Sequence, residues 1–379
     1  MVKQKFFDKK YVSLFVFLFI NFMFGMKYLS RISSHYLIFS LLILAFYTFI
    51  WIKKDKITFL LQKLKLSANL LLILYFIFSI ALLYFVPKES LSVDRWSVIS
   101  SFWENYFHNE YAYAAKSFGG NYPGPMPFYF VLALPFYLIG ELGLFSFLGI
   151  TTFVLVIKNI NKSFEYTSIS LLFIATSLFY VWEICARSNI FINGSLILFS
   201  ILFFFKKYKK TINSNLIFGI IIGLLLSTRN VFVIPYIITF VYALRTKKID
   251  VKNTFYLGII TLFTFILTFL PFVWDHFSDF KVMNPFIVQS SFLVPFKYTL
   301  LFIFSAFCLS FLCKKEEDVY FYSGLSLFLT ILFYFGLVVF NNSFNAAYYE
   351  SKADISYFIL CLPFFIYHIF LNEKTEVKH

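Results

Sequence analysis

The chain has 379 residues, of which 60% are hydrophobic and 14% are charged, and its net charge is +14. A soluble globular protein has about 25% charged residues, so this composition excludes an ordinary soluble domain and predicts a polytopic membrane protein. The excess of Lys and Arg indicates anionic lipid headgroups as partners, and the sequence makes no case for nucleic acid. The four cysteines lie in or beside apolar runs without a CxxC pair, so neither a disulfide framework nor a zinc site is indicated.

The apolar runs predict about twelve membrane-spanning helices, since a spanning helix needs roughly 17–25 residues. They lie at 11–29, 36–52, 67–86, 141–157, 167–183, 190–205, 213–228, 231–244, 254–273, 294–312, 319–340 and 354–371. The first run is interpreted as an uncleaved anchor, because no cleavage site of small residues follows it before Lys27. We therefore expect an all-α transmembrane helix bundle forming a single integral-membrane domain.

The distribution of lysines predicts the orientation of the bundle. If the N-terminus is cytoplasmic, seven segments on that side hold 23 of the 33 Lys and Arg residues. These segments are 1–10, 53–65, 158–162, 206–210, 245–252, 314–315 and 374–378. This orientation requires that the run at 126–140 adds no crossing, so we expect it to be re-entrant, interfacial or the broken first half of the 141–157 span.

The arginines follow a different distribution from the lysines. Arg31, Arg95, Arg187 and Arg229, four of the five arginines, fall on the outer side in this orientation. A guanidinium group suits bidentate recognition of carboxylate and phosphate, whereas a positive-inside signal needs only charge. The outer face is therefore predicted to be the binding face.

The longest polar stretch, 86–130, is rich in aromatics and prolines. Asp94 lies just after an apolar run, and apolar residues then recur at three- and four-residue steps, at Trp96, Ile99, Trp103, Tyr106 and Phe107. This spacing predicts an amphipathic helix over 96–118 that lies along the membrane surface. Three prolines between residues 123 and 127 then stiffen the chain before the next apolar run.

Two tight turns are predicted on the same outer side. One carries Glu183, Arg187 and Asn189, and the other carries Arg229 after a helix in which Gly219 and Gly223 permit close helix contact. The runs that flank both turns are short. We expect both turns to lie below the outer surface, in a recess shared with Asp94.

In their order along the chain, these features resemble the GT-C superfamily of membrane glycosyltransferases, in particular the protein O-mannosyltransferases and lipid A aminoarabinose transferases. That family has an Asp early in its first outer loop, then an amphipathic helix and a Tyr-Pro-Pro-like turn. In this chain, Asp94, the 96–118 helix, and Tyr122 with the prolines after it occur in the same order. Ala-Arg-Ser-Asn ending at Asn189 is similar to a family motif in which an acid follows Arg, and GIIIGLLLSTRN is similar to a helix ending in a basic residue, here Arg229. The resemblance covers roughly 67–245, with an outer catalytic loop at 87–125, additional N-terminal spans at 1–66 and C-terminal spans at 246–379.

The resemblance implies a glycosyltransferase of cell-envelope polysaccharide biosynthesis at the outer face of a bacterial inner membrane. It would move a sugar from a polyprenyl-phosphate donor to a glycan, lipid or protein acceptor. Asp94 would be the general base, and Arg95, Arg187 and Arg229 would hold the donor phosphate. Glu183, Asn189 and Tyr122 would bind substrate. No cofactor is implied and a divalent metal is not indicated.

Each of these residues also has a structural interpretation. Asp94 would cap the next helix or pair with Arg95, and the arginines would extend to lipid headgroups. Glu183 would pair with Arg187. Aromatic side chains would belong to the interfacial belt, and His108 and His276 would be solvated loop histidines.

Two other functions use similar sequence features. An O-antigen-type polysaccharide polymerase or ligase also uses lipid-linked sugars. Such enzymes resemble one another in a large outer loop, late in the chain, that is rich in Arg and His, whereas the late outer loops of this chain contain no Arg. A lipid or solute transporter predicts repeated halves and charges inside opposed spans, and neither is evident.

Overall fold

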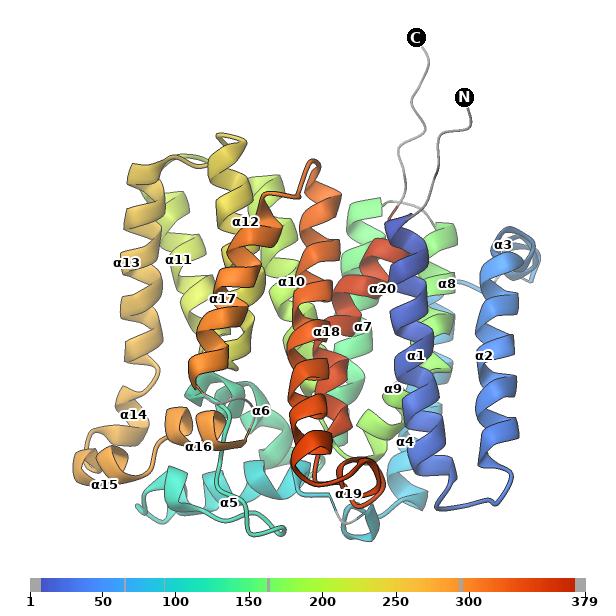
Figure 1. The fold of residues 1–379 in the computed structure, drawn as a ribbon, viewed down its shortest axis with the longest axis horizontal. Coiled ribbons are helices and arrows are strands. Elements are labelled where there is room, and N and C mark those ends of the chain that lie inside the picture. The colour runs from blue at the N-terminus through green and yellow to red at the C-terminus, as the bar shows by residue number, and fades with distance from the viewer. Residues whose placement is uncertain (1–7, 65, 92, 162–163, 293–295, 372–379) are drawn as a thin grey trace.

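The computed structural model describes residues 8–64, 66–91, 93–161, 164–292 and 296–371, and in these residues it contains helices and no strands. Long helices run side by side, and short helices lie across one end of the bundle (Figure 1). The bundle helices are α1 (Lys9–Leu29), α2 (Tyr36–Ile52), α4 (Ala68–Phe85), α7 (Gly143–Asn161), α8 (Phe164–Ala175), α9 (Leu178–Cys185), α10 (Ile190–Lys207), α11 (Ile212–Leu226), α12 (Val233–Arg245), α13 (Val251–Leu267), α17 (Phe296–Ser310), α18 (Glu316–Asn341) and α20 (Leu362–Phe370). The short helices are α3 (Lys54–Lys63), α5 (Arg95–Phe107), α6 (Pro127–Ile139), α14 (Leu270–Val273), α15 (Phe277–Val282), α16 (Pro285–Phe292) and α19 (Phe344–Tyr348), with 3-10 turns η1 (Lys88–Leu91), η2 (Ala112–Ala114), η3 (Asn230–Phe232) and η4 (Ile355–Cys361).

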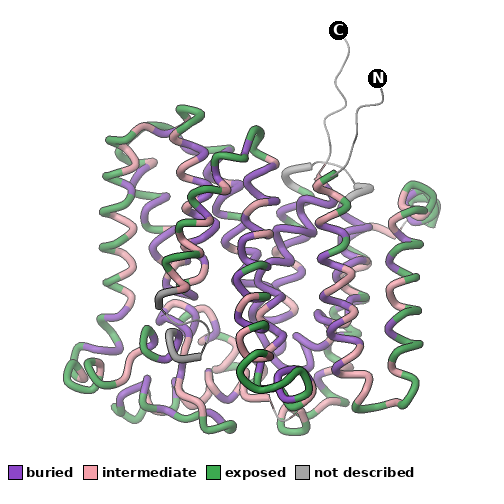
Figure 2. The backbone as a smooth tube through the Cα atoms, in the orientation of Figure 1, coloured by how far each residue is buried: buried purple, intermediate pink, exposed green. Residues whose placement is uncertain are grey.

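The helices agree with an integral membrane protein. By length and composition, five stretches of the described residues can cross a membrane, namely α1, α4, α10, α18 and α13 continued through α14. The bent pairs α2–α3 and α8–α9 raise this number to seven if each pair is one span. Figure 2 shows exposed residues along α2 and α13 at the two edges of the bundle, and those of α13 are largely apolar, as lipid contact requires.

Each predicted apolar run coincides with a helix or a helix pair in the described residues. The run at 167–183 is broken between Ala175 and Leu178, where the chain bends by 64°. At this break the buried side chain of Asn21 accepts a hydrogen bond of 3.1 Å from the backbone N–H of Leu178. A helix of the bundle thus satisfies a backbone group that the break sets free, as a break within an apolar bundle requires.

The lysine-rich segments gather at one end of the bundle. Helix α3 and the α10–α11, α12–α13 and α17–α18 connections all lie at the end where α1 begins and α20 stops (Figure 1). Helices α5, α15, α16 and α19 lie at the opposite end. In the described residues, the predicted separation of the lysine-rich segments from the 87–125 loop is therefore confirmed. Residues 1–7, 65, 162 and 374–378 of those segments, and residue 92 of the loop, lie outside the described residues.

The 126–140 run forms the separate short helix α6. Its 13 residues span about 20 Å, which is less than the ~30 Å thickness of the hydrocarbon core. It ends at Gly140, whose φ of 88° is a left-handed conformation that suits glycine. Helix α6 packs against α5, with the rings of Phe102 and Phe130 stacked at 3.7 Å. The prediction that this run is no independent full-length span agrees with the structure.

Helix α5 is shorter than predicted. It lies across the end of the bundle (Figure 1) and buries Ile99, Phe102 and Trp103, as the spacing predicts. It ends at Phe107 instead of extending to residue 118, because Asn109 adopts a left-handed conformation (φ 60°) and the Glu110 N–H donates back to the Asn105 carbonyl at 2.8 Å. This pattern terminates helices, and Asn is one of the few residues that adopt it readily.

The two glycines of α11 allow the predicted close contact, which is made with α13. A Cβ at Gly223 would lie 2.6 Å from the Thr261 carbonyl oxygen, and a Cβ at Gly219 would lie 2.7 Å from Ile260. Gly258, also on α13, has open space around it.

We expect Gly223→Ala to destabilise the protein by about 1–3 kcal/mol, because the added methyl group forces α11 and α13 apart. Gly258→Ala is the matched control, and its higher helix propensity should leave stability unchanged or raised by up to about 1 kcal/mol. Thermal unfolding in detergent measures both. Equal midpoints for the two variants would contradict the packing described here.

Candidate functional site

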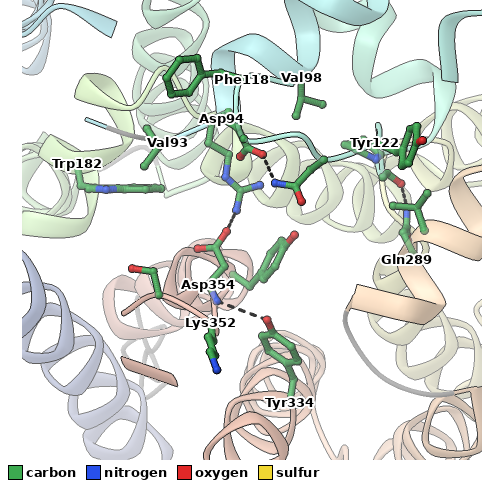
Figure 3. A pocket seen from close by; sticks show the side chains of 18 of the residues that line it. Val93, Asp94, Val98, Phe118, Tyr122, Trp182, Gln289, Tyr334, Lys352 and Asp354 are labelled. Atoms are coloured by element: carbon green, nitrogen blue, oxygen red, sulfur yellow. Dashed lines mark hydrogen bonds and ion pairs between the residues drawn. The ribbon is translucent and has the colours of Figure 1, made fainter. Parts of the chain in front are cut away.

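A cavity of about 670 Å³ lies at the end of the bundle where α5 crosses it (Figure 3). Its walls come from α1, α5, the glycine- and proline-rich segment 118–125, α9, the turn after α11, α16, α18 and the loop before η4. The charged residues that line it are Lys27, Arg31, Asp94, Arg95, Arg229, Glu350, Lys352 and Asp354. The cavity therefore combines residues from almost the whole length of the chain.

Asp94 has one anchored carboxylate oxygen. It occupies the N-cap position of α5, but its side chain makes no capping hydrogen bond. Its Oδ2 instead accepts hydrogen bonds from Ser117 Oγ at 3.0 Å and from Asn121 Nδ2 at 2.6 Å. A Cβ at Gly119 would lie 3.3 Å from Oδ2, so the absence of a side chain there lets the loop close over the carboxylate. The interpretation of Asp94 as a helix cap is wrong, and Oδ1 is left for another partner.

Arg95 is paired with an acid from the far end of the chain. Its guanidinium forms an ion pair with Asp354 (Figure 3), donates to Ser356 Oγ at 2.8 Å and lies 5.0 Å from the ring of Tyr357. Asp354 Oδ1 also accepts hydrogen bonds from the Ser356 backbone N–H at 2.9 Å and from Ser356 Oγ at 2.6 Å. The carboxylate of Asp354 thus compensates the charge of Arg95. The suggested Asp94–Arg95 pair is replaced by this one, and Arg95 is not a free cation for a phosphate.

Arg229 is a buried cation that forms no ion pair with any described residue. It is 5% exposed and lines the cavity, and its guanidinium lies 5.2 Å from the ring of Tyr129 and 5.6 Å from that of Tyr357. Its Nε and Nη2 atoms have no hydrogen-bond partner in the part of the chain that the structure describes. The backbone N–H of Met126 donates to the Thr228 carbonyl at 3.2 Å, so the start of α6 positions this turn. A buried guanidinium without a partner is costly unless a ligand satisfies it.

Arg187 has a structural position outside the cavity. Its Nη1 donates to the carbonyls of Val86 and Cys185, each at 2.7 Å, its Nη2 donates to Leu83 at 3.0 Å, and its Nε lies 3.3 Å from Glu141 Oε1. The positive φ of Arg187 (52°) turns its side chain toward the carbonyls at the end of α4. The expectation that Arg187 shares a recess with Asp94 is therefore wrong. For Arg229, the same expectation is confirmed.

Glu183 and Asn189 are buried and do not line the cavity either. Glu183 Oε1 accepts a 2.7 Å hydrogen bond from the backbone N–H of Phe191, in the first turn of α10. The carboxylate thus satisfies a backbone donor that the start of a helix leaves unpaired. It does not pair with Arg187, whose acidic neighbour is Glu141.

Three aromatic residues of the outer segments, Tyr122, Trp182 and Trp103, separate into two groups. Tyr122 and Trp182 line the cavity, where Trp182 packs edge to face on Phe24 at 5.6 Å. Trp103 does not line the cavity, since it is buried under α5 and donates from Nε1 to the Phe130 carbonyl at 3.2 Å. Tyr122 and Trp182 are therefore available to a ligand, and Trp103 is part of the core.

The histidines of the outer loops lie outside the cavity. His108 contacts the Glu104 carbonyl at 2.7 Å, and His276 lies 3.3 Å from Asp279. Within the described ranges, no group of three or more His, Cys, Asp or Glu residues is arranged to hold a metal ion.

Several cavity residues were not among the predicted site residues. Lys27 belongs to α1 and Arg31 follows that helix, both in the segment predicted to be an N-terminal addition, and Asp354 is the first residue of the last apolar run. Gln289 of α16 closes another side, where its Nε2 donates to the Gly124 carbonyl at 2.5 Å (Figure 3). Two features of the sequence could have identified these residues, namely a lysine inside the first apolar run and an acid at the start of the last apolar run. Neither feature shows which residues the charged side chain will meet in the folded protein.

The sequence matches no protein-family model, and no curated protein or solved structure shows significant similarity to it.

Proposed function

We propose that this chain is a membrane glycosyltransferase of the GT-C type, which transfers a sugar from a polyprenyl-phosphate donor to an acceptor hydroxyl at the outer face of a bacterial inner membrane. The observation that carries the proposal is one cavity that holds two groups. One is the Asp94 carboxylate, whose Oδ1 accepts no hydrogen bond from a described residue, and the other is the buried guanidinium of Arg229, whose Nε and Nη2 have no described partner. Displacement of a phosphate by a hydroxyl needs both groups, a base for the proton and a cation for the leaving group.

Asp94 is the general base in this proposal. The acceptor hydroxyl gives its proton to Oδ1 as its oxygen forms a bond to the anomeric carbon of the donor sugar. Ser117 and Asn121 hold Oδ2 from the other side, which fixes the direction of the carboxylate. A positioned base of this kind contributes typically ~10²–10⁴-fold to the rate.

Arg229 takes the leaving group. The bond between the anomeric carbon and the phosphate oxygen breaks, and the phosphate leaves with the electron pair. Its growing negative charge meets the Nε and Nη2 donors that lack partners in the described structure. A cation in a recess with little water stabilises this charge more than a solvated one does.

The position of the cavity suits a lipid-linked donor. We assign one crossing to each of the twelve helices or helix pairs that match the predicted runs. An even number of crossings puts both chain ends on the same side of the membrane, and the lysine distribution indicates that this side is the cytoplasm. The cavity is then at the outer boundary. The isoprenoid tail of the donor stays in the bilayer while its phosphate lies at headgroup depth, the level at which α5 crosses the end of the bundle.

The direct test is transfer by the purified protein. Incubated in detergent with radiolabelled lipid-linked sugars extracted from bacterial membranes, the protein should release polyprenyl phosphate and move label from the lipid fraction to an acceptor fraction. A protein that leaves the labelled lipids at the level of a protein-free control, in every acceptor extract, contradicts the proposal.

The orientation has a test of its own. In a background with the four native cysteines replaced, a cysteine at the exposed Glu110 should react with an impermeant thiol reagent in intact cells, and a cysteine at the exposed Asn213 should react only after lysis. Glu110 closely follows α5, and Asn213 lies in the first turn of α11, beside the α10–α11 connection at the opposite end of the bundle (Figure 1). Reaction of the second site alone in intact cells contradicts an outer active site.

A further inference from the structure

Lys27 is a second buried cation in the cavity, and the reaction proposed above does not use it. It lies in the last turn of α1, lines the cavity and is 2% exposed. Its ammonium makes no hydrogen bond or ion pair with any described residue, and its nearest aromatic rings are those of Tyr28 and Tyr348, each at 5.9 Å.

Two ordinary explanations of such a lysine do not hold here. A lysine near the C-terminus of a helix commonly bonds the last carbonyls, but Lys27 donates to none of them in the described structure. A lysine at a membrane boundary commonly extends its ammonium to water, but this side chain is almost fully buried. Its charge is therefore kept in a recess at a cost in free energy, unless a ligand compensates it.

Lys27 and Arg229 contact different rings of the cavity. Arg229 and Arg95 share the ring of Tyr357. Lys27 contacts other rings and acts on the charge of Asp354 without forming an ion pair with it. Lys27 is near Tyr28 and Tyr348, and Arg229 is near Tyr129 and Tyr357, so the two cations share none of these rings.

We propose that the α1 wall of the cavity, with Lys27 at its centre, binds an oxyanion on the acceptor, a carboxylate or a phosphate separate from the donor phosphate held at Arg229. This inference rests on the proposed function for the identity of donor and acceptor, whereas anion binding at Lys27 does not depend on it. A diphosphate donor, whose two phosphates are joined through one oxygen, is the alternative occupant, because one such molecule would bind both cations.

The rim of the cavity supports an acidic acceptor. Arg31 and Lys352 are exposed and line the same cavity, where Arg31 donates to Ser351 Oγ at 3.2 Å and Lys352 donates to Asn342 at 3.0 Å. Neither hydrogen bond compensates a charge. The exposed carboxylate of Glu350 also lines the cavity, so the rim carries two exposed cations and one exposed acid. This excess of positive charge above a buried cation attracts an anion and increases its rate of entry.

Inorganic phosphate is the probe for this position. Thermal unfolding of the purified protein is measured at increasing phosphate, with sodium chloride keeping the ionic strength constant. Phosphate should raise the midpoint temperature of the parent, because a ligand that binds only the folded state stabilises it. Lys27→Met and Arg229→Gln should each lose part of that shift, about half where the two positions bind with similar affinity, and the double variant should lose all of it.

The controls separate this inference from the proposed function. Lys281→Met removes an exposed lysine outside the cavity and should keep the full phosphate shift. Without phosphate, Lys27→Met should be at least as stable as the parent, since it removes an uncompensated buried charge. A full phosphate shift in Lys27→Met overturns the inference and leaves the donor site at Arg229 standing. If only Arg229→Gln keeps the full phosphate shift, the donor phosphate site at Arg229 is overturned and anion binding at Lys27 stands.

Inorganic pyrophosphate distinguishes the acceptor from a diphosphate donor. If the position at Lys27 belongs to the acceptor, pyrophosphate should give a shift that each single variant reduces only in part, as with phosphate. If either single substitution abolishes the whole pyrophosphate shift, one molecule bridges both cations, and the assignment to the acceptor is overturned.

Discussion

Asp94→Asn is expected to lower sugar transfer from a polyprenyl-phosphate donor by about 10²–10⁴-fold, the contribution of a general base. Asparagine has nearly the same shape as aspartate, and its carbonyl oxygen can still accept the hydrogen bonds from Ser117 and Asn121 that anchor Oδ2. It cannot take a proton from the acceptor hydroxyl. The assay is initial-rate transfer by purified protein, with donor binding measured separately.

Because the side chain of Asp94 makes no capping bond, the substitution should change the free energy of unfolding by only about 1 kcal/mol, the net worth of a typical hydrogen bond. Glu104→Gln is the matched control, since it makes the same chemical change on the exposed face of α5, outside the cavity. It should keep full transfer. An Asp94→Asn protein that is folded and transfers sugar at the parental rate would remove Asp94 from the role of base.

The helices could be predicted from the sequence because their signal is local. A run of apolar residues of bilayer length forms a helix wherever it is placed, and the α5 spacing and the lysine distribution are equally local signals. The end of α5 was predicted wrongly because the local pattern fits two outcomes. It depends on the left-handed conformation of Asn109, and that residue also falls on the polar face of a longer helix, so the pattern did not distinguish a stop from a continuation.

The composition of the cavity could be predicted only in part. Asp94, Arg95, Tyr122 and Arg229 line it, and these residues lie in the outer segments that the lysine count identifies. The partner of Arg95 could not be predicted, because Asp354 lies 259 positions away and nothing in the sequence relates the two.

Arg187 was predicted to bind the donor phosphate, but the structure places it outside the cavity. A buried arginine in a tight outer turn has the same sequence appearance whether its donors meet a ligand or the carbonyls of a neighbouring helix. At Arg187 they meet the carbonyls of Leu83, Val86 and Cys185. At Arg229, Nε and Nη2 meet no described partner. The difference lies in which helix ends beside each turn, and only the packed structure decides it.

That difference predicts opposite outcomes for the same substitution at the two arginines. Arg187→Lys keeps the charge but loses donors to several carbonyls, and each buried carbonyl left without a donor costs about 1–3 kcal/mol. This variant should therefore unfold at a clearly lower temperature, and its transfer per folded molecule should be close to that of the parent.

Arg229→Lys should give the reverse result. No hydrogen bond of Nε or Nη2 within the described structure is lost, so the thermal midpoint should change little, apart from weaker contact with the rings of Tyr129 and Tyr357. Lysine is a point charge without the planar pair of donors that fits a phosphate. Transfer should therefore fall by about 10²–10³-fold, the usual loss when one preorganised donor to a developing negative charge is removed.

The two variants are measured side by side, by thermal unfolding and by initial-rate transfer normalised to folded protein. If Arg229→Lys transfers as fast as the parent, Arg229 does not hold the leaving phosphate, and its burial without a partner needs another ligand. If Arg187→Lys instead loses transfer at an unchanged midpoint, the donors of Arg187 serve the reaction and not the end of α4, and the cavity of Asp94 and Arg229 is then not the complete site.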